Sequence, residues 1–111
     1  MRLDAYTIVF LRRPADSPDF TDEQLAEIQR GHVAFNARMR EAGHAITTGP
    51  FVDQPDVSWR GIDVFRTSVE ETRKLLVDDP AIKVRRMQAD VFTWLVPEGT
   101  LGDTPAATID D

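Results

Sequence analysis

The chain has 111 residues, a length typical of one domain that buries roughly two thirds of its unfolded surface. It contains no cysteine, which excludes disulfides, a thiol nucleophile and a zinc–thiolate site. The formal net charge is −6 and there is no block of basic residues, so nucleic acid is not an expected partner. No signal-peptide pattern and no apolar run of about 20 residues is present, so we expect a cytoplasmic protein without a membrane partner.

The chain alternates between segments with strand character and segments with helix character. Strands are predicted over residues 3–11, 44–48, 59–66 and 87–96. The first and last of these are apolar on both faces, so we expect both to be central strands covered on both sides. In the third, Asp63 is expected to face solvent. Helices can cover only one face of such a sheet, and a second subunit is the simplest cover for the other.

The two predicted helices carry clear end signals. The first runs from residue 22 to about residue 42, with a capping box formed by Thr21 and Gln24 and a stop at Gly43. The second follows a cap at Thr67 or Ser68 and stops near residue 78. A short further helix is expected to begin at residue 80.

The order strand–helix–strand–strand–helix–strand predicts an α+β fold of the ferredoxin-like, split βαβ type. It has a four-stranded antiparallel sheet with both helices on one face. The right-handed crossover rule leads us to expect the first and fourth strands in the middle. Residues 1–97 form the predicted domain. Residues 98–111 carry four acids and no base, and we expect this acidic tail to be disordered.

The first predicted helix has one apolar stripe with a single ionisable member, His32. The stripe recurs at steps of three and four and comprises Leu25, Ile28, His32, Phe35, Met39 and Ala42. A buried imidazole needs a polar partner, and we expect Asp79 to be within hydrogen-bond reach. Asp78 is the competing carboxylate, and we expect one of these two aspartates to cap the short helix that begins at residue 80. The pair could form an acid–base dyad or a structural hydrogen bond. Gly31 could allow close approach beside His32 or could be a neutral surface position.

Four short motifs together resemble the YciI-like (YCII-related) proteins. They are Gln29-Arg30-Gly31-His32, Arg40-Glu41-Ala42-Gly43, Thr48-Gly49-Pro50 and Asp78-Asp79-Pro80. The resemblance covers roughly residues 3–96. It implies a dimeric α+β barrel, in which two sheets pack face to face, and a pocket whose histidine and aspartate are here His32 and Asp79. Ala81 departs from the family, in which an aromatic residue usually follows the Asp-Pro.

Candidate ligand-binding residues are Tyr6, Gly49, Pro50 and Arg60. Aromatic residues at strand spacing, such as Tyr6, could instead belong to the core or a dimer interface. Four arginines at strand ends could bind an anionic substrate or be solvated: Arg12, Arg13, Arg60 and Arg66. The spacing of the two histidines does not predict a metal site, and we expect no metal and no cofactor.

Two classes of function follow from these features. The first is a small-molecule enzyme of isomerase, lyase or dehydrochlorinase type, acting by proton transfer through His32 and Asp79. The second is a non-catalytic dimeric module that binds a small ligand or regulates a neighbour. A histidine at the wall of an open cavity favours the first, whereas a pair sealed in the core favours the second.

Overall fold

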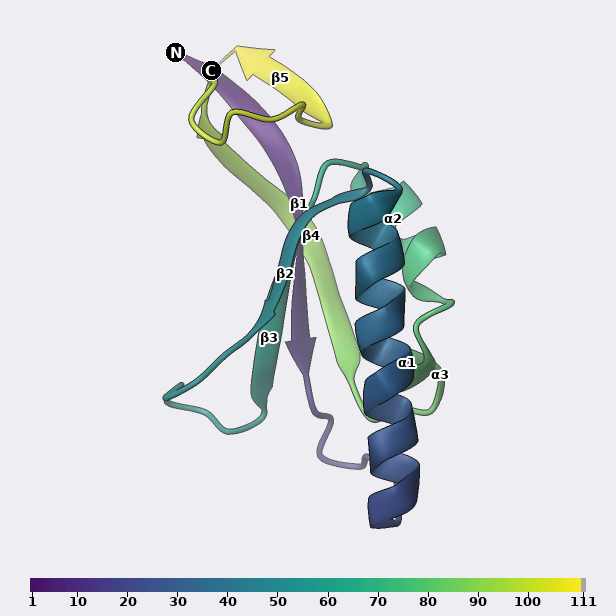
Figure 1. Cartoon of the computed structure of the whole chain (residues 1–111). Helices are drawn as coiled ribbons and strands as arrows, with labels where there is room; N and C mark the ends of the chain where they lie inside the picture. The colour runs from purple at the N-terminus through teal and green to yellow at the C-terminus, as the bar shows by residue number, and fades with distance from the viewer. Residues whose placement is uncertain (111) are drawn as a thin grey trace.

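An antiparallel sheet with a layer of helices on one face makes up the fold of the computed structural model, which describes residues 1–110 (Figure 1). The elements are β1 (Arg2–Arg12), α1 (Asp22–Glu41), β2 (Ala45–Pro50), β3 (Trp59–Phe65), α2 (Val69–Leu76), α3 (Pro80–Lys83), β4 (Gln88–Pro97) and β5 (Ala107–Asp110). The strand order is β2-β3-β1-β4, and β5 also pairs with β1. The predicted α+β, ferredoxin-like arrangement is confirmed.

Local sequence explains where α1 begins and ends. The Thr21 hydroxyl accepts from the Gln24 backbone N–H, and the Gln24 side chain accepts in return from the Thr21 N–H. This capping box satisfies two N–H groups that the first helical turn leaves without partners. At the other end, Gly43 has φ +81°, a left-handed conformation that glycine adopts without strain.

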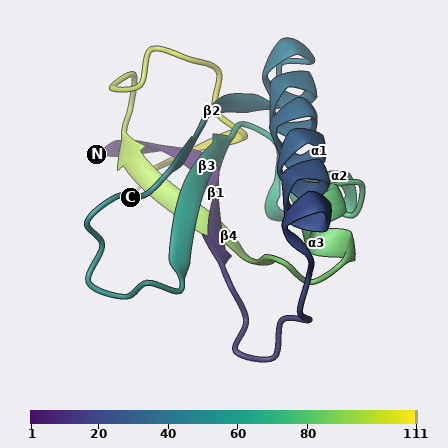
Figure 2. The same ribbon diagram turned by 60° about the horizontal axis from the view of Figure 1, so that its bottom comes forward.

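The core lies between the helices and one face of the sheet. Residues of β1 with odd numbers, such as Val9 and Leu11, point toward α1. Those with even numbers point to the opposite face, which no helix of residues 1–110 covers, as the two-residue period of a strand requires. The main cluster of buried apolar side chains comprises Val9, Leu11, Phe35, Met39, Ala45, Phe65 and Leu76. Figure 2 shows α1 lying along the sheet with α2 and α3 beside it. The cluster therefore fixes α1 across the strands.

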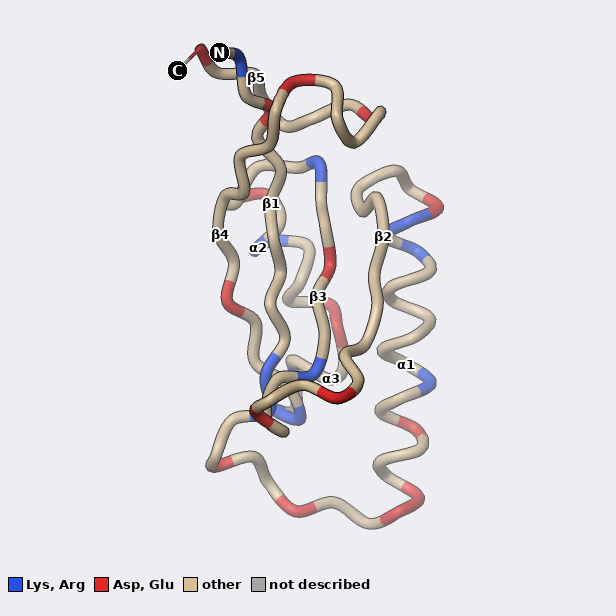
Figure 3. The backbone as a smooth tube through the Cα atoms, turned by 90° about the vertical axis from the view of Figure 1, so that its left-hand side faces the viewer, with Lys and Arg blue, Asp and Glu red and all other residues tan. Residues whose placement is uncertain are grey.

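The expectation that the fourth strand is central was wrong, because β4 is an edge strand and β3 lies beside β1 in the middle. In this topology each crossover helix carries the chain past one strand, so β3 comes between β1 and β2. The apolar pattern of β4 has another cause. Val91 packs against the core, while Phe92 and Trp94 on the other face are 48% and 42% exposed. Figure 3 views this uncovered face with the strands in front.

The tail also differs from the expectation, because residues 98–110 follow a defined path. β5 pairs with β1 in antiparallel register from Arg2↔Asp110 to Ala5↔Ala107. The carboxylate of Asp4, buried on β1, accepts from the Gly99 N–H at 2.8 Å and from the Thr108 hydroxyl at 2.9 Å. Sequence composition alone missed these contacts because they join the two ends of the chain. Asp111 lies outside the described residues.

The part of the chain that the structure describes contains no helix long and apolar enough to cross a membrane.

Candidate functional site

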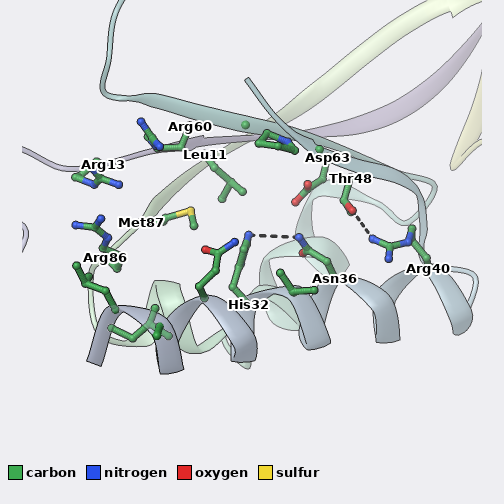
Figure 4. A pocket seen from close by; sticks show the side chains of 18 residues that line it. Leu11, Arg13, His32, Asn36, Arg40, Thr48, Arg60, Asp63, Arg86 and Met87 are labelled. Carbon is green, nitrogen blue, oxygen red and sulfur yellow. Dashed lines mark hydrogen bonds between the residues drawn. The ribbon is translucent and has the colours of Figure 1, made fainter. Parts of the chain in front are cut away.

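A cavity of about 560 Å³ lies between α1 and the sheet. Its walls come from α1, from the ends of β1 and β2, from the beginning of β3 and from the residues just before β4. Figure 4 shows this cavity with α1 on one side and the strands on the other. Small-molecule sites in proteins are usually concave spaces of about 300–1,000 Å³. The cavity therefore has the size of a site for a small ligand.

His32 projects from the middle of α1 to this cavity and holds Asp79 behind it. The His32 Nδ1 and the Asp79 Oδ2 are 2.8 Å apart, which confirms the expected contact. His32 is 7% exposed and lines the cavity, whereas Asp79 is 1% exposed and is not among the lining residues. The pair therefore has one member at the wall of the cavity and one in the core.

Close packing of α1 on α3 brings these two residues together. A Cβ atom added at Gly31 would lie 2.6 Å from the Pro80 Cγ, closer than real Cβ contacts allow. Gly31 therefore allows α1 to approach α3 closely and is not a neutral surface position. Asp79 is also the N-cap of α3, since its Oδ1 accepts from the Ala81 N–H at 2.9 Å. The exposed Asp78 does neither.

The second ring nitrogen of His32 has a different neighbour. Its Nε2 lies 3.3 Å from the Asn36 Nδ2, one helical turn further along α1 (Figure 4). A neutral imidazole that donates its Nδ1 proton to Asp79 has an acceptor lone pair on Nε2. Asn36 and Arg40 follow His32 at steps of four and both line the cavity. Helical spacing was the sequence signal for this polar row, and it was missed.

Opposing effects act on the pKa of His32. Burial lowers it, but the hydrogen bond to Asp79 and the negative charges of Asp79 and Asp63 raise it by more. The net pKa of His32 is therefore raised above 6.5. Asp79 favours the imidazolium and fixes which nitrogen of the neutral ring carries the proton.

Asp63 corrects the expectation that it faces solvent. It is 2% exposed, lies on the helix-facing side of β3 and lines the cavity. Burial and the charge of Asp79 raise the pKa of Asp63 to about 7, although His32 and Arg40 act in the other direction. Its Oδ1 has no hydrogen-bond partner among the described residues. The alternation of β3 was a sufficient signal, because Asp63 shares a face with the core residue Phe65.

Three of the four predicted ligand-binding residues lie at the cavity. Gly49 and Pro50 line it from the end of β2, and Arg60 lines it from β3. Tyr6 does not, because it is buried on the opposite face of the sheet. Its hydroxyl donates to the Asp103 carbonyl at 3.1 Å. Tyr6 therefore contacts the C-terminal segment and not the cavity.

Within residues 1–110, no group of three or more His, Cys, Asp or Glu side chains is arranged to hold a metal ion. His44 lies just before β2 and is not among the residues that line the cavity with His32.

Comparison with known proteins supports the fold. No family model and no curated protein matches the sequence. A solved structure that is similar is the 5-chloro-2-hydroxyhydroquinone dehydrochlorinase from Burkholderia phenoliruptrix AC1100, in complex with 2,5-dihydroxybenzoquinone. Its TM-score is 0.56 at 14% identity, and the match covers 81% of this chain and 92% of that chain. At this identity the likeness shows that the two chains share a fold.

Proposed function

We propose that this protein is a small-molecule enzyme of isomerase, lyase or dehydrochlorinase type, in which His32 transfers a proton. The observation that carries the proposal is the position of His32, with Nδ1 held by Asp79 and the ring at the wall of an open cavity. A histidine oriented by a carboxylate is the usual arrangement for a general base. The solved dehydrochlorinase with the same fold, and the resemblance to YciI-like proteins, add support.

In the proposed step, Nε2 of neutral His32 removes a proton from a carbon of the substrate. The electron pair of that C–H bond stays on the substrate as an enolate or a similar anion. The proton then returns at another carbon, which is isomerisation, or a leaving group such as chloride departs with its electron pair, which is elimination. Asp63, whose raised pKa keeps a proton available near neutral pH, is the proposed general acid.

A second candidate is a non-catalytic ligand-binding or regulatory module in which the pair is structural. The observation that favours it is that both carboxylate oxygens of Asp79 are occupied, one by His32 and one by the cap of α3. In this alternative Asp79 joins α1 to α3, and the cavity only binds its ligand.

Proton exchange in D₂O distinguishes the two candidates, because a panel of compounds with acidic C–H bonds can stand in for the substrate. We would follow 2-oxo acids, other enolisable acids and chlorinated hydroquinones by NMR, with His32→Gln as the test variant and His44→Gln, at the other histidine, as the control. The enzyme proposal expects exchange or elimination that His32→Gln abolishes and His44→Gln retains. Equal rates in wild type and His32→Gln would contradict a catalytic role for His32.

The dyad has its own test. Asp79→Asn removes the charge that raises the pKa of His32, so that pKa, followed by NMR, should fall. Because the base acts in its neutral form, the rising limb of the pH–rate profile should move to lower pH. An unchanged pKa in Asp79→Asn would show that this carboxylate does not tune the imidazole.

The proposal includes a homodimer through the uncovered sheet face, as the family resemblance implies. Phe92 and Trp94 are exposed on this face, and no helix within residues 1–110 covers it. A cytoplasmic location stays a prediction.

A further inference from the structure

Positive charge is concentrated on the walls of the cavity. The lining residues include Arg13, Arg40, Arg60 and Arg86, whereas Asp63 is the one carboxylate among the lining residues that the structure describes. The whole chain, in contrast, has a formal net charge of −6. Figure 4 shows Arg13, Arg60 and Arg86 together near Leu11 and Met87, with Arg40 at the opposite side beside Thr48. We call Arg13, Arg60 and Arg86 the arginine end of the cavity.

Building on the proposed function, we propose that the substrate is a small organic anion whose carboxylate or phosphate group binds at the arginine end. Its reacting carbon then faces His32 and Asp63, which lie along the same cavity (Figure 4). Guanidinium groups are the side chains best suited to bind planar or multidentate anions, because they present several N–H donors in a fixed plane.

The strongest support is the contrast between neighbouring arginines. Arg12 forms an ion pair with Asp90 at 2.7 Å, and Arg85 forms one with Asp16 at 2.5 Å. The next residue in each case, Arg13 or Arg86, lines the cavity and has no carboxylate within 4.0 Å in the described part of the chain. In each of these two neighbouring pairs, the arginine that lines the cavity is the one without a carboxylate partner in the described part of the chain.

Arg13 is the cavity arginine with the clearest capacity for a further hydrogen-bond acceptor. Its Nε is buried and has no hydrogen-bond partner among residues 1–110. Burial and the charges of Arg86 and Arg60 lower the pKa of Arg13. A buried donor without a partner is unfavourable, and a bound anion would supply both an acceptor and a negative charge.

The other two cationic side chains fit this arrangement in different ways. Arg60 donates one N–H to the Val57 carbonyl at 3.1 Å, which positions the guanidinium and leaves its other donors for a ligand. Arg40 donates to the Thr48 hydroxyl across the cavity from the arginine end (Figure 4). His32 and Asp63 lie between the two ends (Figure 4), which favours a ligand with its anionic group at the arginine end and its reacting carbon beside these two residues.

The test measures binding by titration calorimetry on the full chain, so it does not need turnover. Benzoate, inorganic phosphate and neutral benzamide are the probes. The chain provides matched variants: Arg13→Gln and Arg86→Gln at the cavity, with Arg12→Gln and Arg85→Gln as controls that make the same charge change one residue away. Circular dichroism verifies that each variant is folded, and a salt titration of the wild type gives a second measure.

We expect benzoate or phosphate to bind and benzamide to bind at least about tenfold more weakly. Whichever anion binds more tightly identifies a carboxylate or a phosphate as the preferred group. Arg13→Gln and Arg86→Gln should each weaken binding by about tenfold or more, and the two controls by no more than about twofold. The affinity should also fall as salt is added.

Equal binding of benzoate and benzamide, no detectable binding of either anion, or full affinity in both cavity variants would overturn the proposal. These outcomes are separate from failure of the proposed function. Anion binding that is lost in Arg13→Gln, together with proton exchange that is unchanged in His32→Gln, would retain the anion site and reject the enzyme. Turnover that depends on His32 but occurs only with neutral compounds would support the enzyme and reject the anion site.

Discussion

At the scale of single residues, His32 and Asp63 are two titratable groups that share one cavity and one charge balance. Each raises the other's tendency to be charged, because the imidazolium lowers the pKa of Asp63 and the carboxylate raises that of His32. Burial opposes both charges. The two groups therefore titrate as a coupled pair, and their states depend on what the cavity holds.

The raised pKa values of Asp63 and His32 predict that the free energy of unfolding falls as pH rises. The pKa of Asp63 is about 7 in the folded chain against 3.8 for an ordinary Asp, so the folded state binds more protons across this window. Stability should decline from about pH 4 to pH 7, and the raised pKa of His32 should extend the decline above 6.5. Asp63→Asn removes one buried charge and should be more stable than wild type at pH 8, by on the order of 2 kcal/mol.

Urea unfolding at pH 5 and pH 8 measures this effect. The control is Asp53→Asn, an exposed carboxylate on the loop before β3, which should leave the pH dependence as it is. A variant at Asp63 that is less stable than wild type at pH 8 would mean that the ionised carboxylate is satisfied in the folded state.

At the scale of elements, the packing of α1 on α3 is what places Asp79 behind His32. Helix propensity alone would make Gly31→Ala stabilising by up to about 1 kcal/mol. The Pro80 ring, however, lies 2.6 Å from the position of the new Cβ and cannot turn aside as a flexible side chain would. We predict that Gly31→Ala destabilises the protein by about 1–3 kcal/mol.

Thermal unfolding of Gly31→Ala measures this cost, and Ala34→Gly gives the converse case at an exposed position further along the same helix. In the second variant only propensity acts, so a loss of about 1 kcal/mol is expected. The His32 NMR signals should move in Gly31→Ala, because α3 must shift away from α1. A stabilised Gly31→Ala with unchanged His32 signals would show that the close approach is easily relieved.

The C-terminal segment is the second element-scale feature with a measurable consequence. Truncation after Glu98 removes β5 and the two donors to the buried Asp4 carboxylate. It also removes the Asp103 partner of Arg66, which lies at 2.6 Å. We predict a loss of about 1–3 kcal/mol, seen as a fall in melting temperature of several degrees. The matched control in full-length protein is Thr104→Ala, because the Thr104 side chain makes no hydrogen bond within the described residues.

An unchanged melting temperature after truncation would mean that the C-terminal segment is dispensable for folding. Asp4→Asn with the tail in place separates the two parts of the effect. This change weakens the acceptor of both hydrogen bonds while keeping the β5 ladder.

At the scale of the whole molecule, the sheet has one face covered by helices and one face open. The open face carries Phe92 and Trp94, 48% and 42% exposed, next to the buried Tyr6 and Ile8 on β1. We predict a homodimer through this face that buries at least about 1,200 Å². Sedimentation equilibrium at micromolar concentration measures the mass, and Trp94→Glu should give a folded monomer. The control is Glu98→Ala at the surface. Thr93→Glu is not an equivalent change, because Thr93 lies on the helix-facing side of the same strand. A wild-type monomer at these concentrations would contradict the dimer.

Local patterns in the sequence determined the elements and much of the contact between His32 and Asp79. The ends of α1 follow from Thr21, Gln24 and Gly43, because capping contacts join residues close in the chain. The stripe that contains His32 follows from the helical period, and Asp79 follows from the Asp-Pro turn that starts α3. These signals need only neighbouring residues, so they can be interpreted without a fold.

The tertiary structure decided what the chain brings together from a distance. It placed β4 at the edge, paired β5 with β1, put Tyr6 on the face away from the cavity, and aimed Asp63 into it. It also separated arginines that form ion pairs from those that face the cavity, as in Arg12 and Arg13. Composition cannot distinguish such neighbours, because burial and counter-charge depend on the elements that pack around each side chain.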